Sequence, residues 1–188
     1  MSVTVKTTGM KLEDIRKAAS QLVRNAPRIA GRYAVEHTRD NILKRSGQPV
    51  NGSVQKFAPR KYEVRSVKGK KILMDSRTLA NSIKIINLAP MQVSFGVSDN
   101  KIAKYAQAQN EGADIPVTAK MKKFFWAKHY EAGGKKGNAD SDFWKGMALK
   151  KTGSKIHIKA RRFIGITPDI IKGIGRELDA FWNSLIKK

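Results

Sequence analysis

Residues 84–98 read KIINLAPMQVSFGVS and hold the clearest strand pattern of the chain. Pro90 divides this stretch into two runs, 84–89 and 91–98. The second run alternates apolar with polar or small residues, and its apolar positions are Met91, Val93, Phe95 and Val97. Such alternation is typical of a strand with one buried face, and two runs joined by a short turn predict an antiparallel pair.

A long helical pattern precedes this strand pair. Apolar residues recur three or four positions apart through residues 11–45, and Pro27 interrupts them. We therefore expect either a kink or two helices, over about 11–25 and 27–44. The stretch 46–70 shows no period and is rich in Gly, Pro, Ser and Lys, which predicts an exposed loop.

Two shorter helices are expected on either side of the strands. The first has Asp75 or Ser76 as its N-cap. Its buried side would consist of Leu79, Ala80 and Ile83. The second follows Thr118, a residue suited to an N-cap, and covers residues 119–130.

The last third of the chain combines a polar loop, a strand and a long helix. Residues 131–154 are rich in Gly, Lys and Asp and predict a loop around Phe143 and Trp144, before a strand at 156–158. Thr167 then opens the most regular amphipathic helix of the chain. Its apolar residues, at steps of three and four, are Ile171, Ile174, Leu178, Phe181 and Leu185.

This order of elements predicts an α+β fold, with a small, mostly antiparallel sheet packed by helices and a long C-terminal amphipathic helix. Residues 1–45 would form an N-terminal helical arm and 46–70 an exposed basic loop. Residues 71–188 would form the α+β core, with a basic insertion at about 131–154. The side chains expected in the structural core are Leu79, Ile83, Val93, Phe95, Val97, Ile171, Ile174, Leu178 and Phe181.

The chain is strongly basic. Its 188 residues include 38 Lys and Arg, 15 Asp and Glu and no Cys, and the formal net charge is +23. Residues 1–70 carry 16 basic and 5 acidic side chains, and residues 119–162 carry 13 and 3, whereas the remaining segments are close to neutral. A charge of this size attracts polyanions, either nucleic acid or an acidic partner.

The second basic block interleaves lysines with aromatic residues, a mixture that binds phosphate backbones and offers rings for stacking. The candidate contacts to DNA or an acidic partner are Lys122, Lys123, Lys135, Lys136, Lys150, Lys151, Arg161 and Arg162. Helical spacing places Phe124 and Phe125 in the core, whereas Trp144, in a polar loop, is expected at an interface. No helix-turn-helix, zinc-finger, RNP or KH signature accompanies the charge, which argues against sequence-specific readout.

Catalytic groupings are scarce. His37, His129 and His157 fall in different predicted elements, and Asp140 and Asp142 lie in a glycine-rich loop without apolar flanks. We therefore predict no enzymatic activity, no metal and no cofactor. No apolar run approaches the roughly 20 residues of a membrane span, and no export signal is evident, so we expect an intracellular product without a membrane partner.

Four segments, in their order and spacing, resemble the phage virion morphogenesis, or tail completion, family, which includes the Mu G-like and P2 S-like proteins. They are KILMDSRTLANSI (71–83), VSFGV (93–97), YAQAQNEG (105–112) and ARRFIG (160–165). The resemblance covers about residues 57–185. It departs at Arg77, where the family pattern has Gly, and at Ala160, where the pattern has Pro. The basic region 119–154 resembles a lengthened insertion into this pattern.

The resemblance implies a non-enzymatic virion protein of the head–tail junction, a small connector that completes the tail or neck. Such a subunit would form a ring, expected to be a hexamer, around the DNA channel. Its partners would be further copies, neighbouring connector and tail proteins and packaged DNA, after synthesis in the bacterial host cytoplasm. The charge alone leaves an alternative open, a free basic nucleic-acid-binding protein of the ribosomal or nucleoid type.

Overall fold

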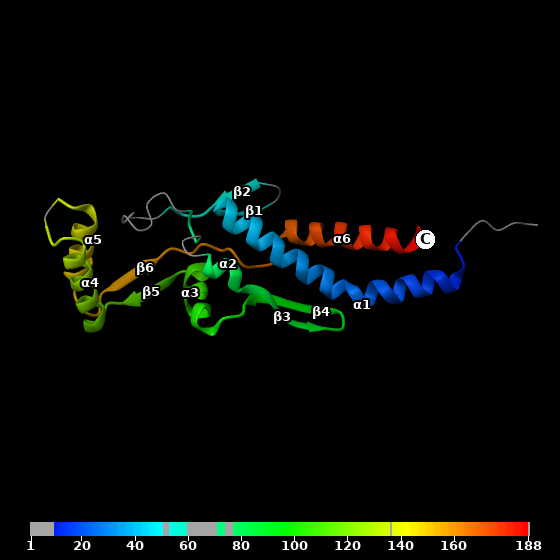
Figure 1. The fold of residues 1–188 in the computed structure, drawn as a ribbon, viewed down its shortest axis with the longest axis horizontal. Coiled ribbons are helices and arrows are strands. Elements are labelled where there is room, and N and C mark those ends of the chain that lie inside the picture. The colour runs from blue at the N-terminus through cyan, green and yellow to red at the C-terminus, as the bar shows by residue number, and fades with distance from the viewer. Residues whose placement is uncertain (1–9, 51–52, 60–70, 74–76, 136, 188) are drawn as a thin grey trace, which may run out of the picture.

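The computed structural model describes residues 10–50, 53–59, 71–73, 77–135 and 137–187. The fold is α+β, as the sequence predicts, and the molecule is elongated (Figure 1). The helices are α1 (Leu12–His37), α2 (Thr78–Ser82), α3 (Asn100–Glu111), α4 (Ala119–Glu131), α5 (Ala139–Ala148) and α6 (Pro168–Ile186), and a π-helical segment η1 (Thr38–Leu43) extends α1. The strands are β1 (Gly47–Val50), β2 (Ser53–Lys56), β3 (Ile83–Ala89), β4 (Gln92–Val97), β5 (Ala113–Pro116) and β6 (Lys155–Ile158).

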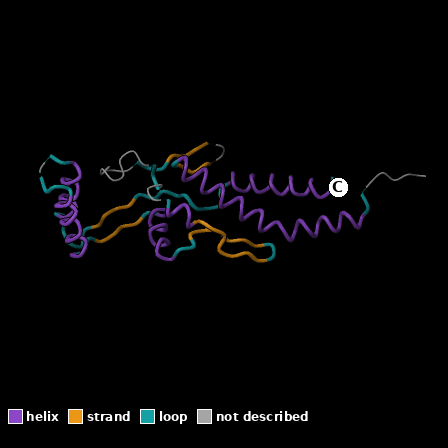
Figure 2. Tube along the Cα trace, viewed as in Figure 1, coloured by secondary structure: helices purple, strands orange, loops and turns teal. Residues whose placement is uncertain are grey.

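In the described part of the chain, the strands pair into three separate two-stranded antiparallel sheets instead of one small sheet (Figure 2). The β3–β4 pair is the one that the alternation predicts, with Ile83 opposite Val97 and Ala89 opposite Gln92. The β1–β2 pair lies where a loop was expected. All of β2 is exposed, so no apolar alternation marks it in the sequence. The rest of the expected loop, residues 60–70, lies outside the described residues.

The apolar face expected on β4 is half-buried. Val93, Phe95 and Val97 point to the same side, and Phe95 and Val97 pack against the main core. Met91 does not belong to this face, because the strand begins one residue later and Met91 lies in the turn with 82% of its surface exposed.

Helix α1 runs through Pro27 without a break, so one bent helix replaces the two that the sequence also allowed (Figure 1). A proline inside a helix removes one backbone hydrogen bond and bends the axis. One side of α1 packs on β3 and β4 through Gly31, where a Cβ atom would lie 2.6 Å from Val93 Cγ2. The opposite flank packs along α6.

Helix α6 starts as predicted, with Thr167 Oγ1 accepting a hydrogen bond from the Ile170 N–H at 3.3 Å. Its buried face is rotated from the expected one, because Ile170 and Gly173 are buried whereas Ile171 is 60% exposed. The prediction for Ile171 was therefore wrong. The four other side chains of the predicted apolar stripe are half-buried: Ile174, Leu178, Phe181 and Leu185.

The main core lies where α1 and η1 meet α2, α3 and the first residues of β3 (Figure 1). Leu79 and Ile83 are buried there, as the sequence indicates. Helix α2 begins at Thr78, which makes Arg77 its N-cap, and Arg77 has left-handed backbone angles of φ 56° and ψ 0°. The expected caps, Asp75 and Ser76, lie outside the described residues.

The segment 131–154 is not a loop, since α5 occupies its centre. Asn138 caps this helix by accepting hydrogen bonds from the N–H groups of Asp140 and Ser141. Helices α4 and α5 pack on each other at the end of the molecule opposite to the C-terminus (Figure 1). None of the helices in the described ranges combines the length and apolar character of a bilayer-spanning segment.

Candidate nucleic-acid interface

The four segments that carry the family resemblance meet in one core, although they lie far apart in the sequence. Each of them contributes buried or half-buried side chains, which are Leu79, Ala80 and Ile83 from the first, Phe95 and Val97 from the second, Ala106 from the third, and Phe163 and Ile164 from the fourth. The four segments therefore form a single packing unit, with Phe163 and Ile83 completely enclosed.

Hydrogen bonds join the third of these segments to the fourth. Asn110 Oδ1 accepts from the backbone N–H groups of Phe163 and Ile164 at 2.9 and 3.0 Å. The Arg161 N–H donates to the Gln109 carbonyl at 2.7 Å, and Arg161 Nη1 donates to Gln109 Oε1 at 2.9 Å. These bonds fix the point at which the chain leaves the core after α3 and returns before α6.

Between these two segments, residues 113–159 form a projection that we call the arm. Its stem is the β5–β6 pair, with Ala113 opposite Ile158 and Pro116 opposite Lys155. Helices α4 and α5 form a hairpin at the end of the stem, away from the body (Figure 1). The residues of the main core include none from the arm, so the arm is an addition to the body.

The helical hairpin has a small core of its own. Phe125 is buried and stacks on Trp144, with ring centroids 6.0 Å apart. His129 Nδ1 lies 2.7 Å from Ser141 Oγ and 2.9 Å from the Ser141 carbonyl, and both residues are buried, which ties α4 to α5. Because both residues are buried between the two helices, this pair is a structural contact that holds the hairpin together.

Two expectations for aromatic residues need correction. Phe124 is 51% exposed, because it lies beside the α4–α5 contact and not within it. Trp144 lies on a helix and packs half-buried against Phe125, so it is part of the hairpin core and not of a polar loop. The Phe124 and Trp144 rings still meet edge to face, with their centroids 6.1 Å apart. Lys128 Nζ lies 5.8 Å from the centroid of the Phe124 ring.

Lysines gather where the hairpin joins the stem, and we call this group the base cluster. The hairpin is antiparallel, so the start of α4 and the end of α5 lie together. The Val117 N–H donates to the Ser154 carbonyl at 2.8 Å, and the Gly153 N–H donates to the Val117 carbonyl at 2.9 Å. The members of the base cluster are Lys120, Lys122, Lys123, Lys150 and Lys151.

The base cluster is electrostatically unfavourable for the isolated arm. The first turn of α4 holds no acidic residue, and its lysines lie at the positive end of the helix dipole. Among the described residues, no carboxylate lies within ion-pair distance of these five lysines. Two acidic groups of the arm instead pair with other lysines, Glu131 with Lys128 at 2.5 Å and Asp114 with Lys155 at 3.9 Å. An anionic partner would relieve this excess of positive charge.

The structure brings together four of the eight predicted contact residues. Lys122, Lys123, Lys150 and Lys151 belong to the base cluster, whereas Lys135 lies at the opposite, outer end of the hairpin. Arg162 is exposed on the body. Lys136 lies outside the described residues.

Arg161, the remaining predicted contact, has its guanidinium bound to the body. Its Nε donates to the Ala58 carbonyl at 3.1 Å, in addition to the bond to Gln109. Lys120 was not among the predicted contacts, although its position at the start of the helix capped by Thr118 could have identified it.

The histidines do not form a site. His37 lies at the end of α1, His129 within the hairpin and His157 on β6. Across the described ranges, no three His, Asp or Glu side chains come together as metal ligands would. Comparisons of the chain with protein-family models, curated proteins and solved structures give no match.

Proposed function

We propose that the chain is a structural virion subunit of the phage head–tail junction, which completes the tail or neck and contacts DNA through the base cluster. In this role it is not an enzyme, and copies of it assemble into a ring around the DNA channel. Its other partners are the connector and tail proteins above and below the ring.

One observation carries this proposal. Arg77 adopts φ 56°, in the left-handed region that favours glycine, and the family pattern has Gly at this position. A position with left-handed backbone angles is one where glycine is favoured, and this agreement supports the resemblance. The convergence of all four resembling segments in one core supports the same interpretation.

The charge of the chain sets a condition on ring assembly. A ring of six copies would carry six times the +23 of one chain, and such a ring repels itself unless salt, DNA or an acidic neighbour screens the charge. We expect sedimentation velocity to show monomers at low ionic strength and rings after addition of salt or duplex DNA. Monomers under all of these conditions would contradict a self-assembled ring.

The role in the virion is tested by electron microscopy of particles made with and without the gene. Filled heads beside unjoined or overlong tails are expected when the gene is absent. Normal joined virions would overturn the proposal and favour the free nucleic-acid-binding protein.

The DNA contact is tested by charge reversal in the base cluster. Lys122, Lys123, Lys150 and Lys151 are changed to Glu, and a control carries Glu at four exposed lysines of the body, which are Lys84, Lys101, Lys104 and Lys172. Both variants change the net charge equally. The base-cluster variant should lower the slope of log Kd against log salt for duplex DNA by about 3.6, since each of the four lost phosphate contacts lowers it by about 0.9. Equal slopes for the two variants would exclude the base cluster as the DNA contact.

A further inference from the structure

Aromatic residues of α4 form an exposed platform in the hairpin of the arm (Figure 1). Tyr130 is 68% exposed, yet its ring rests on two neighbouring rings. Its centroid lies 6.1 Å from that of the half-buried Trp126, at an interplanar angle of 27°, and 5.2 Å from that of the buried His129. We call Trp126 and Tyr130 the ring pair. Its neighbours thus fix the tyrosine ring on one side, and much of the rest is open to solvent.

The glycines that follow α4 leave this ring uncovered. A Cβ at Gly134 would lie 3.4 Å from Tyr130 Cδ1, and a Cβ at Gly133 would meet nothing within 4 Å. The core of the hairpin is the contact of Phe125 with Trp144 and does not depend on Tyr130. A large ring that is held in place but exposed adds little to the core and favours contact with another molecule.

Lysines lie on the same flank of α4 as the ring pair. Successive residues of a helix are about 100° apart, so residues three, four or seven positions apart share one side. Lys122, Trp126 and Tyr130 follow one another at four-residue steps. Lys123 precedes Trp126 by three residues and Tyr130 by seven. The flank of the ring pair therefore begins with two cations of the base cluster.

The other flank of α4 is neutralised. It contains Phe124 and Glu131, which are seven residues apart, and Glu131 pairs with Lys128 at 2.5 Å. Glu131 is the acidic residue of α4, a helix that the structure describes in full. Exposed aromatic rings thus occur on both flanks, but only the ring pair shares its flank with lysines that no carboxylate of the helix offsets.

A further cation lies beyond the ring pair, at the outer end of the hairpin. Lys135 is exposed and follows Gly134, which contacts the tyrosine ring. Two carboxylates of this end, Asp140 and Asp142, lie in the first turn of α5, where the helix dipole favours them. The Gly137 N–H also donates to Asp142 Oδ2 at 3.1 Å.

We propose that the ring pair stacks on unpaired bases of a nucleic-acid strand whose phosphates bind Lys122 and Lys123. This inference rests in part on the DNA contact proposed above, because it shares these two lysines. Every base has a π-face, so the contact is independent of sequence. Seven residues separate Lys123 from Tyr130, which is about 10 Å along the helix and matches about three nucleotides at 3.4 Å each.

Stacking distinguishes a single strand from other anionic partners. In a duplex, each base is covered by its neighbours, so a ring stacks on it only after the duplex is opened. An acidic peptide would bind the lysines but has no bases for the rings. A second copy of the chain also carries +23 and is repelled.

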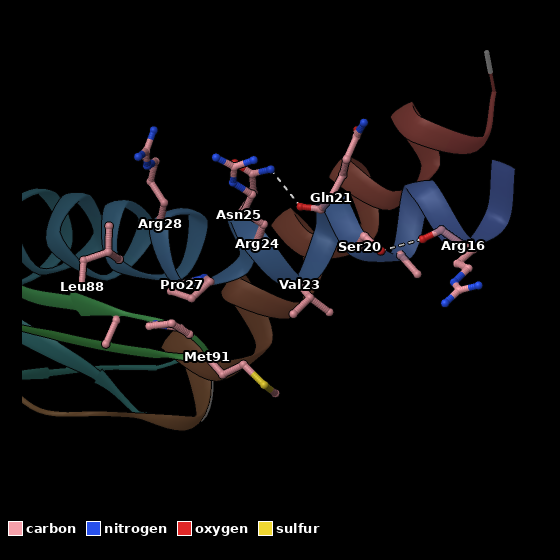
Figure 3. Close-up of a pocket in the computed structure, with 13 residues that line it drawn as sticks. Arg16, Ser20, Gln21, Val23, Arg24, Asn25, Pro27, Arg28, Leu88 and Met91 are labelled. Carbon is pink, nitrogen blue, oxygen red and sulfur yellow. Dashed lines mark hydrogen bonds between the residues drawn. The ribbon is translucent and has the colours of Figure 1, made fainter. Parts of the chain in front are cut away.

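The groove between α1 and the turn of the β3–β4 hairpin lacks this arrangement, although arginines and exposed apolar side chains line it. Figure 3 shows Arg24 and Arg28 on the side of α1 away from Leu88 and Met91, so one partner does not meet both groups. On α4, one strand meets both groups, with its phosphates toward the lysines and its bases toward the rings.

The test compares two labelled strands of about 12 nucleotides, a length within the usual site size for single strands. One is oligothymidine, and the other has the same phosphates but abasic sugars, so the two have equal charge. Fluorescence anisotropy with the full-length protein should show oligothymidine binding at least about tenfold tighter. Equal affinities would mean that the phosphates alone are bound and would overturn the proposal.

Substitutions that leave the net charge unchanged locate the stacking site. Tyr130→Leu removes the ring but keeps an apolar side chain, and it should weaken oligothymidine binding by about tenfold without changing abasic binding. Tyr130→Phe keeps the ring and should stay within about twofold of the natural chain. Phe124→Leu, at a 51% exposed ring on the other flank, is the matched control and should leave binding unchanged. Equal losses in Tyr130→Leu and Phe124→Leu would contradict stacking at the ring pair.

Blunt duplex DNA separates this inference from the proposed DNA contact. Tyr130→Leu should leave duplex affinity unchanged, whereas glutamates in the base cluster should weaken binding of duplex and single strand alike. Weak duplex binding by the natural chain would count against the DNA contact, and equal affinity for oligothymidine and abasic strands against stacking. A parallel loss of duplex affinity in Tyr130→Leu would overturn the selection of unpaired bases. Circular dichroism should show the same fold for each variant, because Tyr130 and Phe124 are exposed.

Discussion

At the scale of one residue, Arg77 holds a left-handed backbone conformation because the residues that follow it are buried in the core. The left-handed conformation costs an arginine about 1–2 kcal/mol, and this cost is offset by the burial of the neighbouring Leu79, Ala80 and Ile83. Changing the residue at this position tests whether the backbone is held there.

Arg77→Gly should raise the free energy of unfolding by about 1 kcal/mol, because glycine adopts positive φ without a Cβ clash. Arg77→Val should lower it by about 1 kcal/mol, since a β-branched residue is strongly disfavoured there. Both variants remove the same charge, so urea unfolding isolates the backbone effect. A lower stability of the glycine variant would show that Arg77 is not strained.

Single residues were predicted well where the signal is local. Thr118 and Thr167 cap α4 and α6 as expected, because a hydroxyl before an apolar run satisfies a backbone N–H within three residues. Ile171 was misplaced because Ile170 is also apolar, and the sequence does not show which of the two faces α1. The choice follows from Gly173, which packs against Tyr33 of α1, a contact that no local pattern reveals.

At the scale of elements, the α1–α6 contact depends on one glycine. A Cβ at Gly173 would lie 2.0 Å from Tyr33 Oη, whereas a Cβ at Gly175, in the same helix, would meet nothing within 4 Å. The two positions therefore form a matched pair.

Gly175→Ala should raise the free energy of unfolding by about 1 kcal/mol, which is the helix-propensity difference between the two residues. Gly173→Ala should lower it by about 1–3 kcal/mol, because the Tyr33 ring must move out of the interface. Urea unfolding of the two variants measures the difference. Equal stabilisation in both would contradict a tight contact at Gly173.

The same contact makes stability depend on pH. Burial lowers the pKa of His37, Asp169 opposes this by raising it, and Arg45 adds to the lowering. The folded state thus binds a proton less tightly than the unfolded chain. The contribution of His37 is complete above the ordinary histidine pKa of 6.5 and is lost as the pH falls from there toward the lowered value.

Thermal unfolding between pH 8 and about 5 should show this loss in the natural chain and a smaller loss in His37→Gln. His157→Gln, at an exposed position on β6, is the control for the removal of a histidine from another part of the chain. An unchanged profile in the His37 variant would assign the pH dependence to other groups.

Elements were predicted from the sequence where one face is buried and the pattern repeats. The alternation of β4 and the three- and four-residue steps of α6 are of this kind. Helix α5 was missed because Gly and Lys flank it and Gly146 lies within it, although Phe143, Trp144, Met147 and Ala148 recur at steps of three and four. The base cluster could not be assembled from the sequence either, since it depends on the antiparallel return of α5 to the start of α4.

At the scale of the whole molecule, body and arm are separable. The chain enters and leaves the arm at neighbouring points, because a Cβ at Gly112 would lie 3.2 Å from the Ala160 backbone nitrogen. A variant in which a short Gly-Ser linker replaces residues 113–159 should therefore keep a cooperative unfolding transition, since the main core contains none of these residues. The same variant should lose most of its affinity for duplex DNA. Circular dichroism and a DNA titration check both results, and loss of the folded body would show that the arm takes part in folding.

The stem of the arm also has a mechanical consequence. Each of its strands has four residues, so the stem is about 13 Å long and, being fully extended, cannot stretch. The stem has no third strand in its sheet, the support that makes a β-hairpin stable by itself, so we expect it to bend more readily than a larger sheet. Bending of the stem would move the base cluster sideways while its distance from the body stays constant. If the base cluster binds duplex DNA, as proposed, this motion would let the lysines follow the turning phosphate backbone while the body stays in place.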